Sequence, residues 1–261
     1  MAQHPLAIAP LLLLAALVYA TGLLAARRRG RSWPSGRAAC WYAGLAAATA
    51  ALAGPDSSFV AHMGGHLLLG MVGPLLLVLG APGTLALRAL PVRQARRLSR
   101  FLATRPVRFL VHPVTAAVLD GGGLWVLYAT PLFAVVMHSP LIQLHVLVAG
   151  VLLAYAVVGP DPMAHRPSPV VRSVALLAFL AAHGILARYL YAHPPAGVPV
   201  ADAENGAELM YYGGDVADLA LVVIFCWQWY DPARFRVGGR RPPQPWRLGS
   251  PSSGRRVTHG G

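Results

Sequence analysis

The chain has 261 residues, of which 56% are hydrophobic and only 12% are charged. A typical soluble domain carries about 25% charged residues, so this composition excludes an ordinary soluble protein and indicates one with several membrane spans. The net charge of +13 comes from 22 basic residues, all arginine, in short segments between apolar runs, which argues against a nucleic-acid partner. Cys40 and Cys226 lie in apolar runs without a CxxC pair, so neither a disulfide framework nor a thiolate metal site is indicated.

Seven apolar runs approach the roughly 20 residues that are needed to cross a bilayer. They predict an all-α fold, a polytopic membrane helix bundle with seven spans at 6–26, 38–54, 65–87, 109–129, 141–159, 170–191 and 209–230. The first run is expected to be a retained span, because no basic segment precedes it and an arginine cluster follows it. We expect one transmembrane domain, residues 1–230, and a basic disordered cytoplasmic tail, residues 231–261.

The arginines predict the orientation of these spans. Connections after the first and third spans carry Arg27 to Arg37 and Arg88 to Arg108, whereas those after spans two, four and six carry none. Arg166 follows the fifth span, and seven more arginines lie in the tail. The positive-inside rule therefore predicts an N-terminus outside and a C-terminus in the cytoplasm. Arg188 is the exception: it extends to the interface or pairs with an acid.

The sequence HMGGH at residues 62–66 puts two histidines and a methionine where the third span begins. His62 and His66 are four residues apart, so on a helix they share one face, with Met63 beside them. An isolated pair of this kind is more often interfacial than metal-binding. Its interpretation therefore depends on what the other spans place beside it.

Later parts of the third span and the segment after it carry signals of their own. Pro74 predicts a kink, and Gly80 to Gly83 predict a break before the basic connection. That connection, residues 88–108, alternates leucines and phenylalanine with arginines in the manner of an amphipathic cytoplasmic helix that lies on anionic headgroups. Residues 191–208 are expected to form an outer loop rich in proline, glycine and acids.

This topology gathers most of the histidines at the outer side of the membrane. The candidate metal ligands are His62, Met63, His66, His145 and His183. Candidates for orienting a ligand or handling protons are Asp120, Glu208, Asp215 and Asp218. Imidazole and thioether groups suit copper, particularly the reduced ion, and the lack of a thiolate set argues against structural zinc.

Each candidate has a simpler alternative. His138 and His193 fit solvated loop positions as well as ligand positions, whereas His145 and His183 lie within spans, where ionisable residues usually face a cavity or the bundle interior. Asp120, in the middle of the fourth span, fits a proton relay and a structural lock equally well. The chain has no nucleophile motif with a histidine and an acid, and no phosphate loop, so hydrolase and ATPase functions have little support.

Several segments together resemble the multi-spanning CtaG-type cytochrome c oxidase assembly factors. They are HMGGH at 62–66, PLLLVLGAP at 74–82, His112-Pro113, the His145 span with GPDP at 159–162, and LMYYGGD at 209–215. Many relatives have an Asp-Gln pair before a glycine and Met-Trp near the last span. Here that place reads Ala207-Glu208-Leu209-Met210, so Glu208 or Asp215 would have to substitute for the aspartate.

The resemblance implies a non-enzymatic assembly factor in a bacterial-type cell membrane. Its implied partners are cytochrome c oxidase subunits and the lipid bilayer, its implied cargo is copper, and no nucleic acid is involved. Residue chemistry alone leaves two rivals. A metal-ion or proton transporter would use Asp120, His183 and Asp215 across the bilayer, and a haem-binding or haem-modifying protein would use paired histidines on facing helices.

Overall fold

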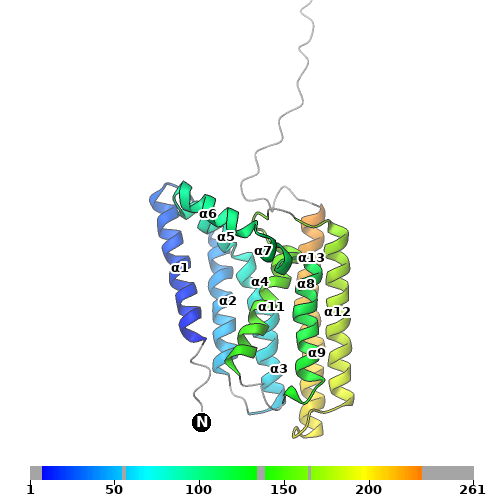
Figure 1. The fold of residues 1–261 in the computed structure, drawn as a ribbon. Helices are drawn as coiled ribbons and strands as arrows, with labels where there is room; N and C mark the ends of the chain where they lie inside the picture. The colour runs from blue at the N-terminus through cyan, green and yellow to red at the C-terminus, as the bar shows by residue number, and fades with distance from the viewer. Residues whose placement is uncertain (1–7, 55–56, 134–138, 164–165, 231–261) are drawn as a thin grey trace, which may run out of the picture.

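The computed structural model describes residues 8–54, 57–133, 139–163 and 166–230. Within these ranges all regular structure is helical, in agreement with the predicted fold class. Figure 1 shows long helices running roughly parallel, with three short helices, α5, α6 and α7, lying across one end. The expected C-terminal tail, and the candidate residues His138 and Met137, lie outside the described residues.

The first two helices form one side of the bundle. α1 (Ala9–Arg28) ends in Arg27 and Arg28, whose charges suit the negative end of a helix dipole, and α2 (Ser35–Ala53) follows after a short turn. Tyr19 of α1 stacks on Trp41 of α2 with 4.7 Å between ring centroids and donates a hydrogen bond to the Gly80 carbonyl at 2.9 Å. These contacts attach α1 to the arginine-rich end.

The third span begins earlier than predicted. α3 (Phe59–Leu67) starts at Phe59, because the Ser58 side chain accepts a hydrogen bond from the Ala61 amide and the Asp202 carboxylate accepts one from the Phe59 amide at 2.7 Å. His62 and Met63 are therefore helical residues rather than residues of the preceding loop.

Beyond α3, a π-helical turn (Leu68–Val72) leads into α4 (Gly73–Leu79). A widened turn here accommodates Pro74, which lacks an amide hydrogen and crowds the preceding turn of an α-helix. The predicted break is present at Ala81, whose φ of 51° is left-handed, and α5 (Pro82–Ala89) begins directly after it.

The basic connection contains two helices where one was predicted. α6 (Val92–Leu102) and α7 (Arg105–Leu110) are separated by a short turn, and neither has a buried residue. In Figure 1, α5, α6 and α7 lie at the bundle end opposite α3. The arginines of the 27–37 and 88–108 segments thus lie at the end of the bundle opposite the HMGGH segment, as the sequence predicted. The sidedness of those ends in a membrane remains a prediction.

The remaining helices complete the bundle. α8 (Pro113–Ala117), a π-helical turn (Val118–Gly122) and α9 (Gly123–Tyr128) form one interrupted helix, followed by α11 (Pro140–Val158), α12 (Pro169–Ala192) and α13 (Val200–Tyr230). α13 starts at Val200, not at 209, so the expected outer loop is largely helical.

Five helices of the described chain are long and apolar enough to cross a membrane. They are Ala9–Arg28, Phe59–Ala89, Pro140–Val158, Pro169–Ala192 and Val200–Tyr230. α2 and the α8–α9 helix are the two further predicted spans; α2 packs on α4, and α8 packs on α11 and α12. Both lie within the bundle, so seven spans remain a prediction that this packing permits.

Glycines let the central helices approach closely. A Cβ at Gly150 of α11 would fall on the Gly70 carbonyl oxygen, and one at Gly44 of α2 would lie 2.8 Å from the Leu77 amide nitrogen. Without a hydrophobic driving force between helices in lipid, such backbone contact is a main source of association. The π-helical turn in the third span is therefore held between α2 and α11.

Replacing Gly150 tests this contact. Gly150→Ala should lower the midpoint of thermal unfolding in detergent, by the equivalent of about 1–3 kcal/mol, because the added methyl group meets backbone and cannot be relieved by a side-chain rotation. Gly36→Ala, where a Cβ meets nothing within 4 Å, is the control and should be neutral. Equal effects of the two substitutions would contradict the packing.

Candidate functional site

Two histidines from different helices lie side by side in the bundle interior. His66 of α3 is 6% exposed and His183 of α12 is 2% exposed, and their ring centroids are 6.1 Å apart. Within the described residues, the Nε2 atom of each ring is buried and has no hydrogen-bond partner. A buried polar atom without a partner costs about 1–3 kcal/mol, so this His66/His183 pair is the strongest indication of a ligand site.

A glycine on the facing helix α13 makes room for the His183 ring, and a glycine one turn after His66 lies beside the His66 ring. A Cβ at Gly214 of α13 would collide with Cε1 of His183, and one at Gly70 would lie 3.4 Å from Cε1 of His66. α13 packs against both α3 and α12, so it brackets the pair. The GGD sequence at 213–215 is thus explained in part by the space that an imidazole needs.

Two methionines lie one turn from the pair, toward the same end of the bundle. Met63 precedes His66 by three residues on α3, and Met210 precedes Gly214 by four residues on α13. Both are fully buried and belong to one apolar cluster with Leu186. A soft thioether environment therefore borders the two imidazoles.

His62 lies one helical turn before His66 and is half-buried, at the wall of a cavity. Its Nε2 atom is 2.9 Å from the hydroxyl oxygen of Tyr128. A cavity of about 260 Å³ is lined by His62, His66, Tyr128 and Gln143, among others. Gln143 has a buried side-chain oxygen with no hydrogen-bond partner in the described chain. The cavity thus connects the half-buried His62 with the buried His66.

Two carboxyl groups lie deeper in the bundle. Asp218 follows Gly214 by one helical turn on α13, and Asp120 lies in the π-helical turn between α8 and α9. Both are buried, and they are close enough to interact electrostatically. Oδ1 of Asp218 has no hydrogen-bond partner in the described residues. The proton relay and the structural lock both stay predictions for Asp120.

Three sequence candidates lie elsewhere. His145 is exposed and packs against α9, where its Nε2 atom would meet a Cβ at Gly123 at 2.6 Å. Glu208 and Asp215 are exposed on α13, although Asp215 is near enough to His183 to act on it electrostatically. The structure therefore brings His66 and His183 together, with Met63 beside them, and leaves His145 and Glu208 outside.

The part of the chain that the structure describes contains no group of three or more histidine, cysteine, aspartate or glutamate side chains arranged to hold a metal ion. A closed zinc-type or carboxylate-rich site is therefore not present in those residues. The donors that do converge are two imidazoles with thioethers nearby, a set that suits a soft monovalent ion.

Sequence reasoning missed Tyr128 and Gln143, and it noted Met210 only by its place near the start of the last span. Tyr128 and Gln143 carry no local signal, because their role depends on contacts between distant helices. Met210 does carry one: with Gly214 and Asp218 it repeats every four residues along a single face of α13.

Fold and site together define a polytopic helical protein with a buried imidazole pair at one end of its bundle. A profile of the family described as cytochrome c oxidase caa3 assembly factor (Caa3_CtaG) matches residues 17–231. The chain belongs to this family, in agreement with the resemblance seen in its motifs.

Curated relatives come from mycobacteria. Uncharacterized protein Mb0105 of Mycobacterium bovis is 38% identical over 189 residues, which are 65% of this chain and 29% of that protein. Uncharacterized protein ML1998 of Mycobacterium leprae is 31% identical over 181 residues, 63% of this chain and 28% of that protein. The chain thus spans less than a third of the length of these relatives. No solved structure gives a significant match.

Tyr128→Phe tests how His62 is held. Loss of the hydroxyl group should lower stability by about 1 kcal/mol, the usual net value of one hydrogen bond. Thermal unfolding of the wild type, Tyr128→Phe, His62→Ala and the double variant forms a double-mutant cycle. Additive effects of the two substitutions would contradict a direct bond.

Proposed function

We propose that this protein assists the maturation of a haem–copper cytochrome c oxidase by holding copper as cargo at the His66/His183 pair. The single observation that carries the copper part is the pair of buried Nε2 atoms, one from each of two helices, without hydrogen-bond partners in the described residues. The oxidase part rests on the family to which the chain belongs.

Donor chemistry supports copper in its reduced state. Imidazole suits several metals, but thioether sulfur favours Cu(I). Met63 and Met210 are buried in one cluster, one helical turn along the chain from His66 and Gly214 respectively. Copper would be bound by the His66 and His183 imidazoles, with Met63 or Met210 supplying sulfur. A set of so few donors leaves the ion exchangeable, which a protein that passes copper to an oxidase subunit requires.

The surrounding groups fit capture and orientation. His62, half-buried beside the 260 Å³ cavity, would meet the ion before the buried pair does. Asp215 acts electrostatically on His183, and the buried Asp218 lies one turn further along α13. Carboxyl groups near a ligating histidine raise its basicity and balance the charge of an arriving cation.

A transporter receives less support from the arrangement. Asp120 and Asp218 extend the buried polar groups toward the middle of the bundle, but Leu221 and Phe225 follow on α13 within an apolar core cluster. The next buried polar residue on α13 is Gln228, ten residues or about 15 Å beyond Asp218. This apolar layer argues for a site open to one side rather than a complete pathway.

Copper stoichiometry of the purified protein tests the proposal. Wild type loaded with Cu(I) should retain about one ion, and His66→Ala or His183→Ala should reduce affinity by at least ~100-fold, because either change removes one of two nitrogen ligands. His193→Ala, an exposed histidine bonded to the Tyr189 carbonyl, is the matched control. Retention of copper by both pair variants, or a haem absorption band in the purified protein, would reject the copper site.

His145→Ala tests whether His145, a ligand candidate from the sequence, contributes to copper binding at the proposed His66/His183 pair. Because His145 packs against α9 away from the pair, its loss should change copper affinity by less than ~3-fold. A loss equal to that of His66→Ala would restore His145 as a ligand.

Oxidase activity in cells tests the functional order of the two histidines in HMGGH. Cells that lack this protein should show lower oxidase activity and lower copper content in the oxidase, and His66→Ala should reproduce this loss more fully than His62→Ala, because His66 is the buried member. Normal oxidase in the absence of the protein would remove the assembly function, whatever the site binds.

A further inference from the structure

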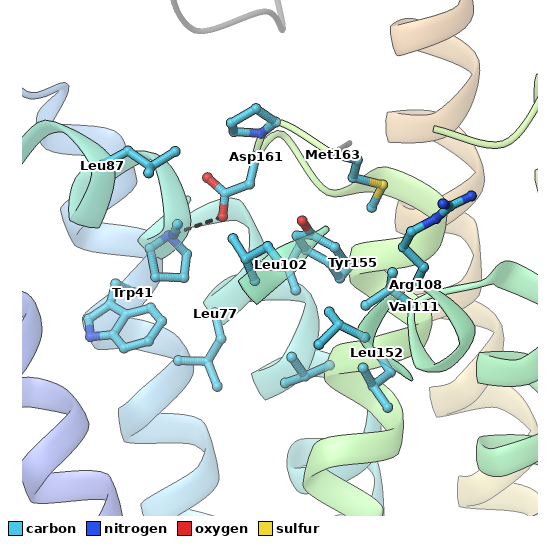
Figure 2. Close-up of a pocket in the computed structure, with 16 residues that line it drawn as sticks. Trp41, Leu77, Leu87, Leu102, Arg108, Val111, Leu152, Tyr155, Asp161 and Met163 are labelled. Carbon is cyan, nitrogen blue, oxygen red and sulfur yellow. Dashed lines mark hydrogen bonds between the residues drawn. The ribbon is translucent and has the colours of Figure 1, made fainter. Parts of the chain in front are cut away.

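An apolar cavity of about 360 Å³ lies at the arginine-rich end of the bundle, and its lining residues include neither His66 nor His183. Figure 2 shows the side chains that line it. Trp41, Leu77 and Leu152 line it from α2, α4 and α11, and Leu102 and Val111 line it from the basic connection and the turn after α7. Its volume falls within the roughly 300–1,000 Å³ of small-molecule sites, and its mainly apolar walls favour hydrocarbon.

The one acidic side chain in this cavity is already engaged. Asp161 accepts hydrogen bonds from the Gly83 amide at 2.9 Å and the Thr84 amide at 2.7 Å, and from the Thr84 hydroxyl at 2.5 Å. It thereby caps the start of α5, which explains the aspartate of the GPDP sequence. Asp161 thus has a structural role at the start of α5, and it brings one negative charge to this end of the bundle.

A basic concavity adjoins the apolar cavity. It is lined by Arg105, Arg108, His112 and Arg166, and it shares Arg108 and Val111 with the cavity. In Figure 2 the guanidinium group of Arg108 lies beyond the apolar side chains, while its stem runs along them. The apolar cavity and the basic concavity therefore adjoin at Arg108.

The charge of this region is not balanced locally. Residues 82–112 carry seven arginines and no acidic residue. Arg–phosphate pairs are among the strongest charge-assisted hydrogen bonds, and a juxtamembrane basic cluster attracts anionic lipid. The negative charge of a lipid headgroup would balance part of the positive charge of these arginines.

We propose that the two adjoining cavities bind one anionic phospholipid, with an acyl chain in the apolar cavity and the phosphate at Arg105 and Arg108. The site is independent of the copper proposal and lies at the opposite end of the bundle. It would anchor the α5–α7 segment to the membrane and fix the position of α5, whose start Asp161 already holds.

Native mass spectrometry of the detergent-purified full chain tests this site, with phosphatidylglycerol and phosphatidylcholine of identical chains as probes. Wild type should retain one phosphatidylglycerol with at least ~10-fold preference. Arg105→Gln/Arg108→Gln should weaken its binding at least ~10-fold. Arg93→Gln/Arg97→Gln, which removes the same charge from exposed positions lining neither cavity, should weaken it less than ~3-fold.

A second pair of variants tests the acyl chain. Leu152→Trp should fill the apolar cavity and lower retention of the lipid, whereas Val148→Trp, at an exposed position one turn away on α11, should not. Equal losses in the two arginine pairs, displacement by glycerol phosphate alone, normal binding by folded Leu152→Trp, or retention of haem or a quinone in place of lipid would each overturn the proposal. If Leu152→Trp does not fold, the arginine pairs decide.

Discussion

The cost of burying unpartnered imidazoles in an apolar bundle is the constraint on which the rest of the site depends. His66 and His183 are both removed from solvent, and each has an Nε2 atom that the described chain leaves without a hydrogen bond. Protein interiors normally satisfy such atoms. Gly214 leaves the space that the His183 ring occupies, because a Cβ at this position would collide with Cε1 of the ring.

The two ends of the bundle differ in their side-chain chemistry. At the histidine end, soft and neutral donors lie among apolar side chains, which favours an ion of low charge and easy exchange. At the other end, residues 82–112 carry seven arginines, and the one aspartate bonded to this segment, Asp161, ties α5 to the turn after α11. The apolar layer around Leu221 and Phe225 separates the two ends. Copper binding at the histidine end would therefore not require an ion to cross the membrane.

Much of the fold was predictable because membrane spans impose simple rules on sequence. Apolar runs and arginine placement gave the helices and put HMGGH opposite the basic segments. Boundaries failed where a distant residue sets them: Asp202 of α13 accepts hydrogen bonds from the first amides of α3, and no local pattern around residue 59 contains that information. The sequence predicts a kink at Pro74, but it does not predict the π-helical turn at Leu68–Val72.

The candidate site was predicted in part for the same reason. The four-residue spacing of HMGGH predicts His66 as a ligand, and the rule that ionisable residues in spans face the interior predicts His183; both side chains are buried. His145 was selected by that rule too, yet it lies beside Gly123, because which side of a helix faces which neighbour is set by tertiary packing. The contact of Tyr128 with His62 could not be predicted from the sequence, because it depends on how the α8–α9 helix packs beside α3.

X-ray absorption at the copper edge of the Cu(I)-loaded protein tests the central claim most directly. Two imidazole nitrogens and at least one sulfur scatterer are predicted in the coordination shell, with the imidazole signal lost in His66→Ala/His183→Ala and retained in His193→Ala. A shell of oxygen scatterers alone, or a spectrum unchanged by the double substitution, would contradict the account.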